Sequence, residues 1–188
     1  MGARNTEAGW GWVAKLLHWT IALAVLGMIA FGFYIDELRE AGEADLATIF
    51  GLFATHKSVG LTILALMILR LAWRLSGPVP ALPEGMPAWE RAAAVGTHWL
   101  LYLALLAMPV SGYVVHTGFP FNSSFFGLFA IPKLFHADEA TRNLASAVHA
   151  ALAWTVLGLV ALHAAAALRH HFFKRDRTLV RMLPFTGR

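Results

Sequence analysis

The sequence predicts an all-α integral membrane protein, a four-helix bundle in which residues 1–188 form one domain. Of the 188 residues, 58% are hydrophobic and only 14% are charged, whereas a soluble domain carries about a quarter charged residues. Four apolar stretches reach the roughly 20 residues that a helix needs to cross a bilayer. They cover about residues 12–34, 53–73, 92–115 and 144–168. Their apolar residues follow a helical period, and no hairpin signal appears, so a transmembrane barrel is not expected.

The first stretch, Trp12–Tyr34, is expected to stay in the mature protein. The residues before it include Arg4 and Glu7, and no small-residue cleavage site follows it, so it does not resemble a signal peptide. The second stretch, Phe53–Trp73, leads into the segment Ser76–Trp89. This segment contains four prolines, which predict a stiff, non-helical connection to the third stretch.

The segment between the third and fourth stretches, His116–Thr141, is rich in phenylalanine, glycine and proline. Such a segment could lie in the membrane interface as a short re-entrant or surface helix, or it could cover the outer edge of a cofactor. Covering the edge of a cofactor and contact with lipid explain its phenylalanines equally well. His116 and His136 in this segment are interpreted as surface residues.

Basic residues predict the orientation of the bundle in the membrane. If both termini lie on one side, most of the 15 Lys and Arg residues lie there too. That side holds Arg4, Lys15, Arg70, Arg74, Arg91, Arg169, Lys174, Arg175, Arg177, Arg181 and Arg188. The other side holds Arg39, Lys57, Lys133 and Arg142, with the acidic loop Asp36–Asp45. The positive-inside rule therefore places both termini on the cytoplasmic side of the membrane. We expect this membrane to be a bacterial inner membrane. The basic tail is expected to lie on anionic lipid, and no nucleic-acid partner is expected.

Five histidines lie within or at the ends of the apolar stretches, and the chain has no cysteine. They are His18, His56, His98, His149 and His163. A polar ring in hydrocarbon is costly without a partner, and the lack of cysteine excludes thiolate-bound zinc and iron–sulfur sites. Neutral imidazoles at two membrane depths therefore point to axial ligands of haem iron.

The depths of these histidines predict how they pair. His149 and His163 are fourteen residues apart on one helix, which returns them to nearly one face with a rise of about 21 Å. At the outer depth His56 matches His149, and at the inner depth His18 matches His163. We therefore expect two bis-histidine b haems stacked across the bilayer. His98 is an alternative inner ligand, and it is the less favoured one.

Other polar residues are assigned roles around these haems. Arg70 and Arg74, one turn apart, are candidates to bind propionates of the inner haem, although positive-inside anchoring explains them equally well. Lys57 is a candidate for an outer propionate or an anion, or it extends to the interface. His170 lies seven residues after His163, at the cytoplasmic boundary, where it could exchange protons with a quinone or contact a lipid head group.

These residues resemble the bacterial cytochrome b561 family over nearly the whole chain. The matching stretches are Leu17-His18-Trp19, His56-Lys57-Ser58-Val59-Gly60 with Arg70 and Arg74, His98 with Tyr102, and Leu162-His163-Ala164-Ala165-Ala166-Ala167-Leu168-Arg169-His170-His171 with the Leu-Val-Arg-Met-Leu-Pro ending.

The resemblance implies a four-helix membrane protein with two b haems and superoxide oxidase activity. In that activity superoxide is oxidised to oxygen at the outer side, and ubiquinone is reduced. The resemblance carries over His56 with His149 and His18 with His163 as ligands, and His170 as a quinone-site residue. A lysine linked to that site in the family has no counterpart in Pro83-Glu84-Gly85-Met86-Pro87.

The expected function is thus electron transfer from superoxide through two haems to ubiquinone. Lys57, Lys133 and Arg142 are the cations available to attract superoxide on the outer side. The alternative is a di-haem subunit of a membrane dehydrogenase or of a periplasmic redox partner. A third possibility is a histidine-lined metal transporter or sensor without haem.

Overall fold

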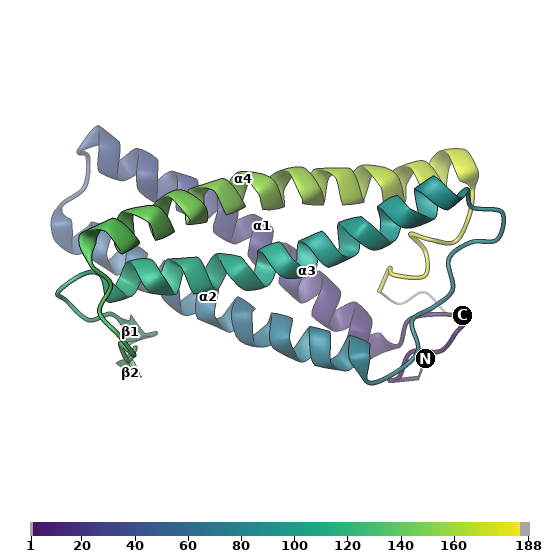
Figure 1. The fold of residues 1–188 in the computed structure, drawn as a ribbon, viewed down its shortest axis with the longest axis horizontal. Coiled ribbons are helices and arrows are strands. Elements are labelled where there is room, and N and C mark those ends of the chain that lie inside the picture. The colour runs from purple at the N-terminus through teal and green to yellow at the C-terminus, as the bar shows by residue number, and fades with distance from the viewer. Residues whose placement is uncertain (1, 185–188) are drawn as a thin grey trace.

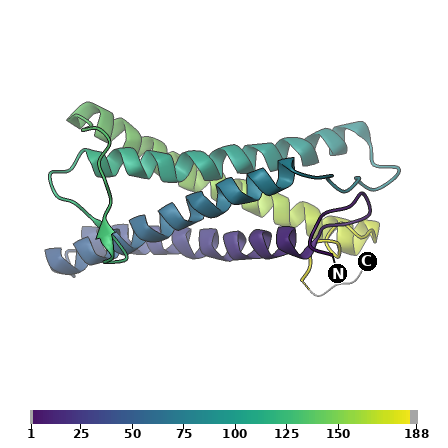
Figure 2. The ribbon, with the colours of Figure 1, turned by 90° about the horizontal axis from the view of Figure 1, so that it is seen from below.

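The computed structural model describes residues 2–184. Four long helices form an elongated bundle (Figure 1), and its crossing helices are seen from below in Figure 2. They are α1 (Trp12–Ala41), α2 (Leu46–Leu75), α3 (Ala88–Thr117) and α4 (Glu139–Arg169), which continues into the short π-helix η1 (His170–Lys174). All four are long and apolar enough to cross a membrane, and the predicted all-α membrane bundle is confirmed.

Each helix contains its predicted span and extends beyond it. The difference is largest on the first connection, Asp36–Asp45, which was expected as a loop. Instead α1 continues to Ala41, with an Asp36–Arg39 ion pair at 3.2 Å on its exposed surface, and the turn is confined to residues 42–45. Charged residues at i, i+3 spacing are compatible with a helix that projects past the hydrocarbon.

Two aspartates, Asp45 and Asp138, cap the N-termini of α2 and α4. The Asp45 side chain accepts a hydrogen bond from the Thr48 backbone N–H at 2.7 Å, and Asp138 accepts one from Thr141 at 2.8 Å. Each satisfies an N–H that the first helical turn leaves without a partner. These hydrogen bonds lower the pKa of both carboxyl groups.

The connection between α3 and α4 is not helical, so the short interfacial helix considered for it does not form. It forms a small antiparallel hairpin of β1 (Ser124–Phe125) and β2 (Phe129–Ala130), visible at one end of Figure 1. Its turn has positive φ at Phe126 (48°) and Gly127 (76°), which a helix does not tolerate. We call this end of the bundle, with residues 118–138, the hairpin end.

The other end carries the described residues of both terminal segments (Figure 1), and we call it the terminal end. Here the tail after η1 lies against α1. The Lys15 ammonium donates to the Leu183 carbonyl at 3.0 Å, and the Trp19 indole donates to the Met182 carbonyl at 2.8 Å. The connection 76–87 between α2 and α3 lies at this end and is not helical, as its prolines predict.

The middle of the bundle is held by apolar side chains at helical spacing. Leu17, Ile21, Val25 and Ile29 lie four residues apart on α1 and are all buried, and Val156 of α4 is fully buried against the same cluster. Large apolar side chains elsewhere on the helices are exposed, such as Leu23 at 67%. An apolar exterior around a packed seam is typical of a protein surrounded by lipid.

Candidate haem site

Two histidines from different helices face each other near the hairpin end. The ring centroids of His56 on α2 and His149 on α4 are 6.1 Å apart, with an angle of 67° between the rings. Metal–imidazole bonds are about 2 Å long, so two rings that share one ion have centroids on the order of 6 Å apart. The spacing of this pair is therefore that of two axial ligands.

The His149 ring is held in one orientation by α3. Its Nδ1 lies 3.0 Å from the Met108 carbonyl and 3.0 Å from the Ser111 hydroxyl oxygen. Since a carbonyl only accepts, Nδ1 carries the proton and donates it, and Nε2 keeps its lone pair. A second-shell hydrogen bond of this kind fixes the tautomer of metal-binding histidines.

Glycines on neighbouring helices make room for both rings of this pair. A Cβ atom on Gly112 of α3 would lie 3.1 Å from Cε1 of His149, and one on Gly32 of α1 would lie 3.4 Å from Cε1 of His56. The His56 ring also stacks on Phe31, with centroids 6.2 Å apart. Its buried Nδ1 has no hydrogen-bond partner among the described residues, so packing sets its orientation.

A second group of histidines lies near the terminal end. The ring centroids of His18 on α1 and His163 on α4 are also 6.1 Å apart. His98 on α3 approaches the same His163 ring at 5.1 Å. Among residues 2–184, no three or more His, Asp or Glu side chains are arranged to hold one metal ion, so His18, His98 and His163 do not converge on a single point.

These side chains fit b haem at both depths. The donors are imidazoles, each pair joins two helices at ligand spacing, and one pair is cradled by glycines and oriented by a backbone carbonyl. When bound, haem supplies a one-electron Fe(III)/Fe(II) couple. The residues that would hold it are His56 with His149 and His18 with His163.

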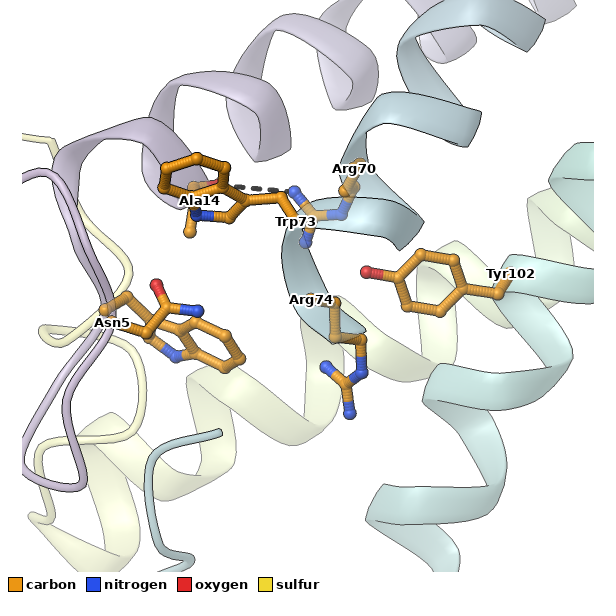
Figure 3. Close-up of a pocket in the computed structure, with 7 residues that line it drawn as sticks. Asn5, Ala14, Arg70, Trp73, Arg74 and Tyr102 are labelled. Atoms are coloured by element: carbon orange, nitrogen blue, oxygen red, sulfur yellow. Dashed lines mark hydrogen bonds between the residues drawn. The ribbon is translucent and has the colours of Figure 1, made fainter. Parts of the chain in front are cut away.

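Arg70 and Arg74 lie at the terminal end, where they line a small open hollow with Tyr102 (Figure 3). Arg70 donates to the Ala14 carbonyl at 3.3 Å, and its guanidinium carbon lies 6.0 Å from the centre of the Tyr102 ring. The Arg74 guanidinium carbon lies 5.6 Å from the same ring. Both cations thus border a hollow on the side of the bundle where the His18–His163 pair lies.

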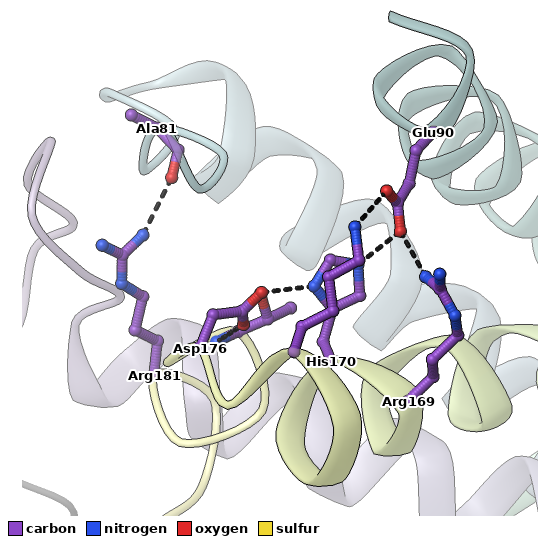
Figure 4. Close-up of polar contacts among 8 residues, drawn as sticks. Ala81, Glu90, Arg169, His170, Asp176 and Arg181 are labelled. Atoms are coloured by element: carbon purple, nitrogen blue, oxygen red, sulfur yellow. Dashed lines mark hydrogen bonds and ion pairs between the residues drawn. The ribbon is translucent and has the colours of Figure 1, made fainter. Parts of the chain in front are cut away.

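His170 lies within a cluster of polar contacts at the terminal end (Figure 4). Only 6% of it is exposed. Its Nε2 lies 3.2 Å from Oε1 of Glu90, and its Nδ1 bonds Oδ2 of Asp176. Glu90 also accepts hydrogen bonds from Arg169 at 2.6 Å and from Lys174 at 2.7 Å.

Three cations predicted to attract an anion gather at the hairpin end, where each is tied to the loop. Lys57 donates to the Ser123 hydroxyl at 2.8 Å, and Lys133 donates to the carbonyls of Phe119 and Phe121. Arg142 stacks over the Phe119 ring at 5.2 Å.

His116, expected on the surface, is instead 1% exposed, and that prediction is wrong. It belongs to the last turn of α3, and residues 119–133 fold back around it through the Lys133 hydrogen bonds. A sequence pattern does not show that an irregular loop covers a helix end. His136 is exposed, as predicted.

Sequence reasoning also missed residues that support the histidines. It assigned no role to Gly32, which lies against His56. It placed His170 at the boundary but did not find Glu90 or Asp176, which come from two other segments. An acidic residue in the first turn of a helix was the only available signal, and it is a weak one.

The chain is similar to known membrane cytochromes. The family model described as Prokaryotic cytochrome b561 matches residues 9–185. "Cytochrome b561 homolog 2" of Escherichia coli is 35% identical over 191 residues, covering 97% of this chain and 95% of the relative. "Probable superoxide oxidase CybB" of Yersinia pestis is 36% identical over 172 residues, covering 89% of this chain and 92% of the relative. "Cytochrome b562" of Cereibacter sphaeroides is 27% identical over 177 residues, covering 94% and 96%.

Proposed function

Because the chain belongs to the prokaryotic cytochrome b561 family of membrane b-type, electron-transferring cytochromes, we propose that it is a superoxide:ubiquinone oxidoreductase with two b haems. Superoxide gives up an electron at the hairpin end, and ubiquinone is reduced at the terminal end. The observation that carries the proposal is the presence of two histidine pairs at ligand spacing, both anchored on α4 but fourteen residues apart.

In this proposal His56 and His149 are the ligands at the hairpin end, and His18 and His163 are those at the terminal end. His149 is oriented by Met108, and the ring of His98 packs against His163 without being a ligand. Arg70 and Arg74 neutralise propionates at the terminal end. The assigned pairs are about 21 Å apart along α4. Electrons therefore pass from one haem to the other to move between the two faces of the membrane.

The hairpin end supports superoxide as the donor. Lys57 is next to His56 in the chain, and Lys133 and Arg142 lie in and beside the loop that covers this end. Cations near a reaction site raise the encounter rate of a small anion. A 36% identical relative carries the name probable superoxide oxidase, which makes superoxide the first substrate to test.

We further propose that both termini lie in the cytoplasm and that the hairpin end faces the periplasm. The excess of Lys and Arg at the terminal end favours this orientation. It brings superoxide to the periplasmic face and takes the protons for ubiquinone reduction from the cytoplasmic face.

The test is a redox spectrum of the purified protein during exposure to a superoxide-generating system and a short-chain ubiquinone. Two low-spin b haems per chain should be reduced by superoxide and reoxidised by the quinone, and superoxide dismutase should abolish the reduction. His56→Ala or His149→Ala should remove one haem and His18→Ala or His163→Ala the other, while His98→Ala should keep both. Haems that superoxide does not reduce, in a protein that co-purifies with a dehydrogenase, would instead identify an electron-transfer subunit.

A further inference from the structure

The connection between α3 and α4 is strongly apolar on its exposed side. No charged residue occurs from Gly118 to Pro132. Around the turn of the hairpin the side chains are large, apolar and exposed, with Phe126 at 53%, Leu128 at 76% and Phe129 at 58%. Adjoining apolar side chains of this size mark a surface that contacts something other than water.

The hairpin lies beside α2 and not beyond its end. Both views place β1 and β2 outside the four helices and set back from the first turns of α2 (Figure 1, Figure 2). The contact that fixes this position is made by Ser58, which lies twelve residues after Leu46, the first residue of α2, and so about 18 Å along the helix. The Ser58 hydroxyl accepts from the Phe126 backbone N–H at 3.0 Å and lies 3.3 Å from the Ser124 carbonyl oxygen.

This position lies within the depth of the hydrocarbon. α2 has 30 residues and is therefore about 45 Å long, whereas the hydrocarbon core of a bilayer is about 30 Å thick. A helix centred in the bilayer extends about 8 Å past the hydrocarbon at each end, which places Ser58 about 10 Å inside it. Because the hairpin is bonded to Ser58, its exposed side chains lie at the depth of the acyl chains.

Ser58 also shows which side of α2 carries the hairpin. It follows His56 by two residues, which is a rotation of about 200° around the helix, so the two side chains point to opposite sides. The His56 ring faces His149 within the bundle, and Ser58 faces the hairpin. The hairpin is thus on the outer side of α2, where contact with lipid explains its phenylalanines better than cover for a cofactor does.

A loop at this depth needs partners for its polar backbone groups within the protein, since hydrocarbon offers none. Backbone hydrogen bonds join the two strands of the hairpin, and side chains of α2 and α3 bond the loop on either side of it. Ser58 bonds Phe126, and the Tyr113 hydroxyl donates to the Pro132 carbonyl at 2.9 Å and accepts from the Leu134 N–H at 3.0 Å. The bundle therefore supplies hydrogen bonds that water supplies to an ordinary loop.

We propose that residues 119–135 form a re-entrant element whose hairpin turn inserts among the acyl chains of the leaflet at the hairpin end. Ser58 of α2 docks this element on the bundle. Its apolar surface continues into that of α2 through Phe121, whose ring packs against Phe50 with centroids 4.9 Å apart, and both side chains are exposed. The partner of this surface is thus the lipid that surrounds the helices.

The test uses single cysteines, because the chain has none of its own. Leu128→Cys reports on the hairpin turn. Glu43→Cys, in the exposed turn before α2, is the reference for water at the same end, and Leu103→Cys, 66% exposed at the middle of α3, is the reference for lipid. The holoprotein is placed in nanodiscs that hold one chain each and is treated with a charged, membrane-impermeant maleimide.

We expect Leu128→Cys to react about as slowly as Leu103→Cys and on the order of tenfold or more slowly than Glu43→Cys, because the reagent needs a thiolate in contact with water. All three should react equally in sodium dodecyl sulfate. Phe129→Cys gives a second position in case Leu128→Cys disturbs the turn. Adding Ser58→Ala to Leu128→Cys should raise the rate several-fold, whereas adding Thr62→Val, the matched control on α2, should not.

Slow reaction in these nanodiscs can be assigned to lipid, because Leu128 is exposed on its own chain and no second chain is present. Reaction of Leu128→Cys and Phe129→Cys as fast as that of Glu43→Cys would place the hairpin in water and overturn the proposal. Fast reaction in nanodiscs with protection in cell membranes would show that a second copy or another protein covers the hairpin, and would overturn it too. A rate that Ser58→Ala leaves unchanged would overturn the docking role of this serine.

Discussion

At the scale of single residues, the histidines are distinguished from ordinary buried imidazoles by what surrounds them. His149 has a hydrogen-bonded Nδ1 and a glycine against its ring, and His56 has a glycine and an aromatic neighbour. A Cβ atom on Gly112 would force the His149 ring to move by tenths of an ångström, whereas one on Gly32 would just touch His56. The position of the His149 ring therefore depends on Gly112.

Gly112→Ala tests this dependence. Its new methyl group would lie 3.1 Å from Cε1 of His149, whereas a methyl group at Gly60 has nothing within 4 Å. We expect Gly112→Ala to lower the haem content at the hairpin end and to alter its low-spin spectrum, since a packed interior resists such a shift. Gly60→Ala, the control, should bind haem as wild type does. Equal haem content and identical spectra in the two variants would count against the role of Gly112.

Residue patterns predicted the histidine pairs because depth along a helix follows from counting residues. Depth alone matches His56 with His149 and His18 with His163, and the rings of each pair lie 6.1 Å apart. His98 also lies 5.1 Å from His163, and the assignment of the haem ligands stays a prediction. The supporting residues were not predictable in this way. Gly32 and Asp176 contact the histidines of other elements or of a reversed tail, and such contacts depend on helix rotation and on loop paths that have no period in the sequence.

At the scale of elements, the four helices could be predicted from the apolar stretches, but the structure of the connection between α3 and α4 could not. Residues 118–138 combine aromatic residues with glycine and proline, a composition shared by interfacial helices and by irregular loops. The decisive feature is one buried serine. The Ser58 hydroxyl on α2 accepts from the Phe126 backbone N–H at 3.0 Å and donates to the Ala54 carbonyl at 2.8 Å, and it thereby docks the hairpin on the bundle.

Ser58→Ala should release this docking. Ser58 is fully buried but Phe126 is 53% exposed, so loss of this hydrogen bond costs about 0.5–1.5 kcal/mol. We expect a lower thermal unfolding temperature and faster proteolysis between residues 118 and 138, with the haem proposed for the terminal end unaffected. Thr62→Val is the control, because the Thr62 hydroxyl donates to the Ser58 carbonyl of its own helix at 2.9 Å. Proteolysis of this segment at the wild-type rate in Ser58→Ala would show that the serine does not hold the hairpin.

The aspartate that caps the N-terminus of α4 should make the stability of the protein sensitive to acid. The pKa of Asp138 is held below its unfolded value by hydrogen bonds from Thr141. A depressed carboxyl pKa contributes stability above the unfolded pKa of about 3.9, and the contribution is lost as the pH falls through the folded value. Asp138→Asn should therefore unfold with a weaker pH dependence below pH 4 than wild type, as measured by helical circular dichroism.

At the scale of the whole molecule, the bundle separates two kinds of chemistry by its length. Cationic side chains and a docked loop occupy the hairpin end, and the buried His170 ring between the carboxyl groups of Glu90 and Asp176 occupies the terminal end. The assigned histidine pairs on α4 are about 21 Å apart. Variants at the two ends should therefore affect different half-reactions. If donor and acceptor reacted at one site, the same variants would affect both half-reactions.

Lys57→Gln and His170→Ala test this separation as a pair. Lys57→Gln should slow haem reduction by superoxide and weaken its dependence on ionic strength, because steering of an anion by nearby cations is screened by salt. It should leave reoxidation by ubiquinone unchanged. His170→Ala should have the opposite effect, with slower reoxidation by ubiquinone and nearly normal reduction by superoxide. Stopped-flow spectra of the two half-reactions measure both rates, and slowing of the same half-reaction by both variants would place donor and acceptor at one end of the bundle.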